Sequence, residues 1–326
     1  MAAVEDAVVA IEKLGGEVDF EYKSLRPQTW LESQLDDPGG CDDPIGVLKV
    51  TFAWLPAHAA DADIKHLKGL TSLRELNLSS TQVTDAGVEH LKGLTKLQHL
   101  DLANTEVSDA GLEHLKGLTK LQQLILSGTK VTGSGLEYLK DLTNLGCLYL
   151  DGTKVTDAGL THLNRLAMLQ QLDLSDTRVT DAGFEHLKGL TKLLLLRADG
   201  TKVNGAGLQH LGGATNLSHL HLLDTEVSDA GLEHLKGMTH LEILDLRGTK
   251  VTDAGLEFLK GLIELQLLML GDKITDEGVK KLQQAMPKCG IYRPALRPHA
   301  PPSYHPPPTR PSCQRIATPQ SDSKPR

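Results

Sequence analysis

The feature that most constrains this chain is an apolar pattern that repeats every 24 residues. From Leu73 onward, one period reads L-x-x-L-x-L-x-x-T-x-V-[T/S]-D-A-G-L-x-x-L-x-x-L-x-x. Its first leucine recurs in constant register at Leu73, Leu97, Leu121, Leu145, Leu169, Leu193, Leu217, Leu241 and Leu265. Internal repetition with such a period predicts a solenoid, in which each period forms one turn and the turns stack side by side.

Each period is predicted to form a short strand followed by a short helix. Leu76 and Leu78 alternate with polar residues as in a strand, and Val88 begins a run of apolar residues at every third position. Thr84–Asp85 offers an N-cap hydroxyl and an acidic residue for the positive end of the helix dipole. Gly93 is expected to end the helix in a left-handed conformation. The cap position holds Ser, Thr or Asn in every period: Thr84, Ser108, Thr132, Thr156, Thr180, Asn204, Ser228, Thr252 and Thr275.

One period cannot be stable alone, because fixing the conformation of 24 residues costs more than the burial of their few apolar side chains contributes. Stacking closes the two open ends of each apolar layer. Parallel strands stack about 4.8 Å apart, whereas helices are wider. We therefore expect an α/β solenoid curved into a horseshoe or arc, with a parallel β-sheet on its concave face and short helices on its convex face.

This pattern resembles the leucine-rich repeat, in the bacterial form that reads L-T-x-L-x-x-L-x-L-x-x-T-x-V-T-D-A-G-L. The resemblance extends from about Val47 to Tyr292. It implies a binding scaffold whose concave strand face contacts a partner. The family's usual Asn is Thr here, and we expect the hydroxyl to bond the backbone of an adjacent turn. The threonines in this position are Thr81, Thr105, Thr129, Thr153, Thr177, Thr201, Thr225 and Thr249.

The two ends of the chain depart from the pattern. In residues 1–46, Val4, Val8 and Ile11 share one helical face, and Val18 and Phe20 alternate as in a strand. We predict that this segment is an N-terminal cap, with the alternative that Trp30 belongs to a docking module. The repeat solenoid with its C-terminal cap is assigned to residues 47–292. Residues 293–326 are rich in Pro, and we predict a disordered tail with polyproline-II character.

The period at 193–216 departs most from the pattern. Ala198 and Ala214 replace leucines of the strand and of the helix, and Gly205, Gly212 and Gly213 weaken the helix. Lost apolar volume destabilises a core when the neighbours do not close in. This period is therefore the predicted weak point of the stack.

Composition narrows the choice of partner and compartment. With 34 Lys and Arg against 42 Asp and Glu, the net charge is −8, which argues against nucleic-acid binding. The N-terminus lacks the basic segment of a signal peptide, and no apolar run reaches the length of about 18–20 residues that a membrane helix needs. We expect a cytoplasmic protein without membrane contact, and a monomer.

The repeat register also predicts which side chains face the concave side. A mixed group around the irregular period suits a protein partner, although drift of that period would produce the same pattern. Aspartates are in surplus on this face, which favours a partner of basic character. The candidate partner-binding residues are Tyr149, Asp173, Leu195, Arg197, His219, His221, Leu223 and Asp245.

Motifs of catalysis are missing from the sequence. It contains no G-x-x-x-x-G-K, no H-E-x-x-H, no nucleophile elbow and no strand-bounded G-x-G-x-x-G. His219 and His221 lie two residues apart near Asp245, but no third convincing metal ligand accompanies them. We therefore expect no enzyme activity, no catalytic residue, no cofactor and no metal.

The predicted function is a non-enzymatic scaffold that binds a protein partner on its concave face. One alternative, which the resemblance allows, is a regulator or substrate adaptor: an enzyme inhibitor, a GTPase-activator-like protein or a ubiquitin-ligase-receptor-like protein. Another is a structural spacer without a ligand. Near-identical helices such as AGLEHLKGLTKL fit a recently duplicated spacer, whereas the varied concave rows favour binding.

Overall fold

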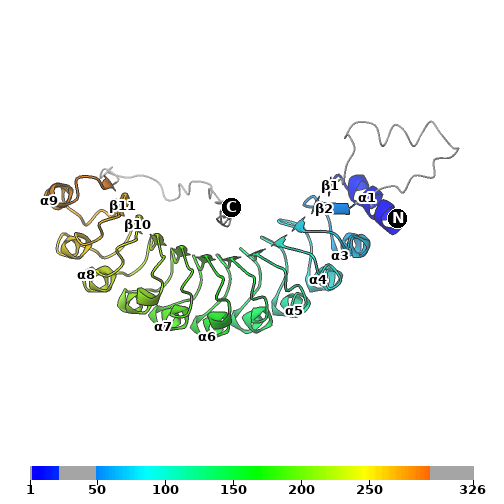
Figure 1. Ribbon diagram of the computed structural model, residues 1–326, viewed down its shortest axis with the longest axis horizontal. Helices are drawn as coiled ribbons and strands as arrows, with labels where there is room; N and C mark the ends of the chain where they lie inside the picture. The colour runs from blue at the N-terminus through cyan, green and yellow to red at the C-terminus, as the bar shows by residue number, and fades with distance from the viewer. Residues whose placement is uncertain (1, 22–48, 294–326) are drawn as a thin grey trace, which may run out of the picture. The chain divides into compact units, whose positions relative to one another are not determined.

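The computed structural model of the protein describes residues 2–21 and 49–293, which belong to one compact unit, Met1–Pro294. Its twelve-stranded sheet follows chain order from β1 to β12. All neighbouring strands are parallel except β1 and β2, which are antiparallel. The strands line the inner side of a curved stack and the helices line its outer side (Figure 1). The predicted α/β solenoid is confirmed.

The strands after β2 are short and recur once in each turn. Their bounds are β1 Glu17–Glu21, β2 Lys49–Trp54, β3 Glu75–Asn77, β4 His99–Asp101, β5 Gln123–Ile125, β6 Cys147–Tyr149, β7 Gln171–Asp173, β8 Leu195–Arg197, β9 His219–His221, β10 Ile243–Leu246, β11 Leu267–Leu270 and β12 Gly290–Tyr292.

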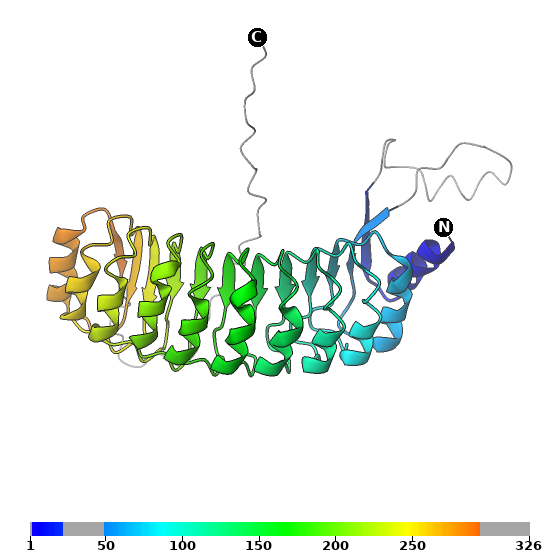
Figure 2. The ribbon, with the colours of Figure 1, turned by 60° about the horizontal axis from the view of Figure 1, so that its bottom comes forward.

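The outer side carries one α-helical or 3-10 segment, or both, in each turn, as Figure 2 shows from a second direction. The α-helices are α1 Ala2–Lys13, α3 Asp61–Ile64, α4 Asp85–Glu89, α5 Asp109–Glu113, α6 Asp157–Leu160, α7 Asp181–Phe184, α8 Asp229–Leu232 and α9 Asp276–Ala285. The 3-10 segments are η1 Lys65–Gly69, η2 Gly133–Leu139, η3 Thr161–Arg165, η4 Glu185–Leu187, η5 Ala206–Gly213, η6 Glu233–Leu235 and η7 Gly255–Leu259.

One continuous leucine core runs through all the turns. The first leucine of each period is buried from Leu73 to Leu265, as are the strand leucines in the positions of Leu76 and Leu78. At the N-terminal end α1 covers this core with Ala7 and Ile11, and β1 pairs with β2. At the other end β12 pairs with β11. The predicted boundaries at 46/47 and 292/293 stay predictions. Trp30 and the tail after Arg293 lie outside the described residues.

Two local expectations were wrong. Each Thr of the ladder donates its hydroxyl to the carbonyl three residues earlier in its own turn, as in Thr81 to Leu78 at 2.7 Å, and not to an adjacent turn. Gly93 is not left-handed. The left-handed position follows the strand instead, with φ between 54° and 68°, and it holds residues that tolerate this conformation. These residues are Ser80, Asn104, Gly128, Gly152, Asp176, Gly200, Asp224 and Gly248.

Aspartate carboxylates join most turns to the next, and Gly133 and Gly205 replace the aspartate in two turns. Asp85 accepts hydrogen bonds from Ser108 N–H at 2.7 Å and from Ser108 Oγ at 2.6 Å, one turn further along the chain. The same two bonds recur in six pairs: Asp61–Thr84, Asp85–Ser108, Asp109–Thr132, Asp157–Thr180, Asp229–Thr252 and Asp253–Thr275. The aspartate of the T-D-A-G-L motif therefore links neighbouring turns, in addition to facing the helix dipole.

The glycine of the same motif is required by this aspartate. A Cβ on Gly111 would lie 2.5 Å from Asp85 Oδ1, closer than real Cβ atoms approach a neighbour. The equivalent glycine of other turns meets the preceding aspartate in the same way, as at Gly87 and Gly183. In the D-A-G triplet, the aspartate therefore bonds the next turn, and the glycine leaves room for the aspartate of the preceding turn.

A hollow of about 270 Å³ lies beside the irregular period. Ala214 and Leu217 contribute to its wall, together with Met238 and His240 of the following turn. Ala214 stands where other turns have a buried leucine such as Leu190. The hollow thus borders the position where the leucine is missing, and the lower stability of this period stays a prediction.

We expect Gly111→Ala to lower the free energy of unfolding by about 1–3 kcal/mol, because the added methyl group collides with the Asp85 carboxylate. Adding Asp85→Ala should cost less than the sum of the two single changes, since the collision with the carboxylate is then gone. Urea unfolding of all three variants measures this coupling. Strictly additive losses would contradict the contact between turns.

Ala214→Leu should stabilise the chain by about 1–2 kcal/mol, because the added carbons enter the hollow and lose contact with water. Ala214→Ser is the matched control, since it changes the same position and leaves the hollow empty. Calorimetric melting temperatures test both. A lower melting temperature for the leucine variant would show that the neighbouring side chains cannot accommodate it.

Candidate functional site

The concave face consists of two rows of side chains that strand pairing aligns across the sheet. The first row joins Phe52, Glu75, His99, Gln123, Cys147, Gln171, Leu195, His219, Ile243 and Leu267. The second row joins Trp54, Asn77, Asp101, Ile125, Tyr149, Asp173, Arg197, His221, Asp245, Met269 and Tyr292. The register therefore reproduces the two rows expected from the repeat.

The predicted site residues lie close together on strands β6–β10, but they differ in access to solvent. Leu195, Arg197, His219, His221 and Leu223 are half-buried and form the accessible part. The other three are buried and form the floor: Tyr149, Asp173 and Asp245. A partner at this place would touch mainly the first five.

An ionic network occupies the second row here. Arg197 Nε lies 3.6 Å from Asp173 Oδ2, and Arg197 Nη2 lies 3.3 Å from Asp199 Oδ2. Arg247 donates to both carboxylate oxygens of Asp245, from Nε to Oδ1 at 2.9 Å and from Nη2 to Oδ2 at 2.5 Å. Arginine and aspartate side chains of the concave face are thus paired with one another. The sequence did not indicate Arg247 as part of the site, because the repeat register does not show that its side chain turns back to Asp245.

Burial shifts the titration of the groups beside Arg197. It raises the pKa of Asp173 to about 6, although hydrogen bonds from Ser175 act against this change. Burial likewise raises the pKa of Asp199. Burial lowers the pKa of His221 to about 4, and the positive charge of Arg197 acts in the same direction. The charge of Asp173 in this network therefore changes near pH 6.

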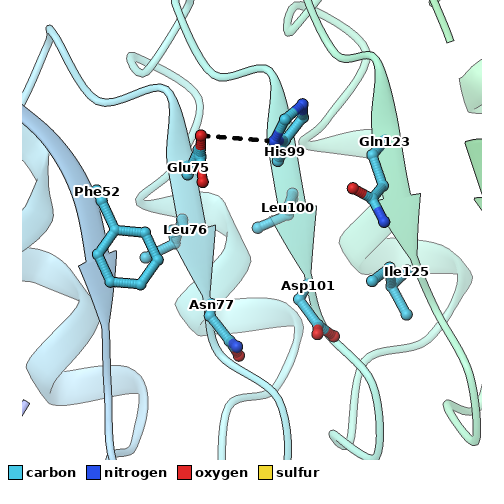
Figure 3. A pocket seen from close by; sticks show the side chains of 9 residues that line it. All are labelled: Phe52, Glu75, Leu76, Asn77, His99, Leu100, Asp101, Gln123 and Ile125. Carbon is cyan, nitrogen blue, oxygen red and sulfur yellow. Dashed lines mark ion pairs between the residues drawn. The ribbon is translucent and has the colours of Figure 1, made fainter. Parts of the chain in front are cut away.

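A hollow that the sequence did not predict lies nearer the N-terminus, across β2–β5. We call it the N-terminal groove; it measures about 170 Å³. Figure 3 shows the Phe52 ring at one side, the polar heads of Glu75 and His99 at one end, and those of Asn77 and Asp101 at the other. The remaining lining residues are Leu76, Leu100, Gln123 and Ile125. His99 Nδ1 lies 3.7 Å from Glu75 Oε1.

Strand β1 extends this surface. Its antiparallel pairing sets Asp19 opposite Phe52 and Glu17 opposite Trp54. Directly opposed residues share one face of a sheet, so both acids lie on the concave side, and both are exposed. The alternation of acidic and apolar residues in E-V-D-F-E indicates that one side of this strand is acidic. Only its pairing with β2 shows that the acidic side belongs to the concave face.

Within residues 2–21 and 49–293, no group of three or more His, Cys, Asp or Glu side chains is placed to hold a metal ion. In the same ranges, no helix is both long and apolar enough to cross a membrane.

Comparison with known proteins agrees with this architecture. One family profile, described as Leucine rich repeat, matches residues 71–131, and a second, described as Leucine Rich repeat, matches residues 165–187 and 237–260. An internalin C2 (inlC2) from Listeria monocytogenes str. 4b F2365 shares 28% sequence identity at a TM-score of 0.52, over 66% of this chain and 84% of that chain. An internalin (inlF) from the same strain shares 19% identity at a TM-score of 0.45, over 78% and 92% of the two chains. No curated protein matches the chain.

The repeat profiles, the successive parallel strands and the likeness to inlC2 together define a leucine-rich-repeat protein. The chain is a bacterial leucine-rich-repeat protein, as the T-D-A-G-L form of its 24-residue repeat indicated.

The pKa shifts of Asp173 and His221 predict opposite effects of pH on stability. The raised pKa of Asp173 makes the free energy of unfolding fall as pH rises from about 4 to about 6. The lowered pKa of His221 makes it rise from about pH 4 to about pH 6.5. Asp173→Asn should therefore show stability rising with pH, and His221→Gln the reverse, each by on the order of 2 kcal/mol.

Calorimetric melting temperatures of the parent and both variants across this pH range measure the two slopes. In the parent the two contributions oppose each other, so its slope should lie between those of the variants. Parallel slopes for all three proteins would contradict the assignment of the shifts to these side chains.

Proposed function

We propose that the chain is a non-enzymatic scaffold that binds a protein partner on its concave face. One contrast carries the proposal. The outer turns repeat nearly the same sequence, as in AGLEHLKGLTKL, whereas the concave rows change chemistry from strand to strand. A surface that only maintains a stack has no reason to vary in this way. Leucine-rich-repeat domains in general mediate protein–protein interaction, which supports the same function.

A structural spacer is the main competing function, because near-identical turns also arise by recent duplication. A regulator or substrate adaptor would be a special case of the scaffold, distinguished by its partner. The spacer and the scaffold differ in a measurable way, since only the scaffold holds one protein at one face.

Site-directed photo-crosslinking separates the two functions. A photoreactive phenylalanine analogue is placed on the concave face at Leu195 or His219, and on the outer side at Lys116 or Lys188. In a lysate of the source cells, we expect the same partner to be captured from both concave positions and from neither outer position. Capture at the outer positions alone, or at none, would favour the spacer.

We also propose the cytoplasmic location that the sequence predicts. Fractionation of the source cells, with the protein detected by antibody, tests it. Recovery in the envelope or the medium would overturn this part of the proposal.

A further inference from the structure

We propose that copies of this chain associate end to end, with the acidic end of one copy docked on the basic end of the next. The acidic end is residues 2–21, and the basic end is residues 271–293. The inference goes beyond the proposed function, because it concerns the two ends of the stack and leaves the concave face open to another protein. It replaces the monomer expected from the sequence by an assembly that grows with protein concentration.

The acidic end presents α1 as its outermost helix. Ala7 and Ile11 are buried against the core, so the opposite side of the helix faces solvent. Residues 2–21 contain six Asp and Glu against one Lys, a net charge of −5. The exposed residues of α1 are Glu5, Asp6, Val9, Glu12 and Lys13. No ion pair joins these three acids to another described residue, although α1 contacts η1, which contains Lys65 and Lys68.

The basic end presents α9 as its outermost helix. Leu282 is buried, whereas Lys280, Lys281 and Gln284 are exposed on the other side of the helix. Residues 271–293 contain five Lys and Arg against three Asp and Glu, a net charge of +2. The two outermost helices of the stack therefore present opposite charges to solvent.

Two of the three acids in the basic end are paired within it. Glu277 lies 3.6 Å from Lys281 Nζ, and Asp276 pairs with Arg293. The other basic side chains of this end form no ion pair with a described residue, and all are exposed. They are Lys273, Lys280 and Lys288. This end thus has cations available for a carboxylate from outside.

The adjoining segments have the same signs as the ends to which they are joined. Residues 22–48 contain five Asp and Glu against two Lys and Arg, whereas residues 294–326 contain five Lys and Arg against one Asp. Surfaces of opposite sign attract one another and set their mutual orientation. The net charge of −8 makes two copies repel in most orientations, so attraction is confined to the approach of unlike ends.

The stack keeps the two ends of one chain apart. α1 and α9 lie at opposite ends of the curved array (Figure 1). The twelve strands between them span about 50 Å along the sheet, at about 4.8 Å between neighbours. One continuous core joins all the turns, so the acidic end cannot meet the basic end of its own chain. The two surfaces can meet only between copies, and such a head-to-tail contact can repeat and add further copies.

The two helices match in length and add a small apolar contact. α1 has 12 residues and α9 has 10, which correspond to about 18 Å and 15 Å. Val9 is 46% exposed between Glu5 and Glu12 on α1. Ala285 is exposed one turn after Lys281 on α9. A small contact dominated by exposed charges is weak and depends on ionic strength, so we expect a dissociation constant in the micromolar to millimolar range.

Sedimentation equilibrium of the full chain tests the association. At up to about 1 mM protein and about 0.02 M salt, we expect a weight-average mass that rises above the 35.3 kDa of one chain. At about 0.5 M salt the mass should return to that of one chain, because the Debye length falls from about 20 Å to about 4 Å.

Charge reversal locates the contact. Glu5→Lys with Glu12→Lys gives α1 a basic exposed face, and Lys280→Glu with Lys288→Glu makes the basic end acidic. Each variant alone should associate at least about tenfold more weakly than the parent. An equimolar mixture of the two should associate again, because unlike ends of the two variants then face each other. Such recovery also requires that both variants are folded.

Matched controls make the same changes of net charge on the convex side, in the middle of the stack. They are Glu113→Lys with Glu185→Lys, and Lys116→Glu with Lys188→Glu, all at exposed positions. Both should associate within about twofold of the parent. Glu5→Gln with Glu12→Gln is a second test of the acidic end, should a reversal variant fail to fold, and should weaken association several-fold.

Four outcomes would overturn the inference: a parent that sediments as one chain throughout, association that persists in high salt, equal loss in the convex-side controls, or folded reversal variants that do not associate when mixed. In the first case the two ends would be available only to other proteins. The proposed function is tested separately, since a partner captured from Leu195 and His219 by the E5K/E12K variant would retain the scaffold without self-association. Self-association without a captured partner would retain this inference alone.

Discussion

The structure depends on one constraint: no turn can close its own apolar layer. Each layer of leucines is covered by the turns on either side, so burial, and with it stability, exists only in the stack. The aspartate bonds between turns and the glycine that admits each carboxylate hold the layers in register. Since a change inside one turn is transmitted to its neighbours, the buried positions vary little along the chain.

This constraint does not apply to the concave rows, because their side chains point away from the core. They are aligned by strand pairing and separated by one strand spacing, whatever residues they carry. The same scaffold can therefore carry the arginine–aspartate network around Arg197 and the acidic N-terminal groove beside Phe52. Fold and surface chemistry are nearly independent in such an array.

The sheet, the core and both concave rows could be predicted from the sequence, because Leu76 and its equivalents must be buried and therefore recur as leucine every 24 residues. It could not predict that Asp85 bonds the next turn, since the partner lies 23 residues away. Nor could it separate the half-buried Leu195 from the buried Asp245, because access depends on neighbouring side chains. The acidic face of β1 required knowledge of the strand with which it pairs.

Hydroxyl-radical footprinting tests concave-face binding most directly, because it reports solvent access of individual side chains. Phe52 and Leu267 report on the two ends of the concave face, whereas Met168 and Ile263 lie in exposed loops before strands β7 and β11. On adding the crosslinked partner in purified form, the account predicts slower oxidation of Phe52, of Leu267 or of both, and unchanged oxidation of Met168 and Ile263. Protection of the two loop residues with Phe52 and Leu267 unchanged would contradict it.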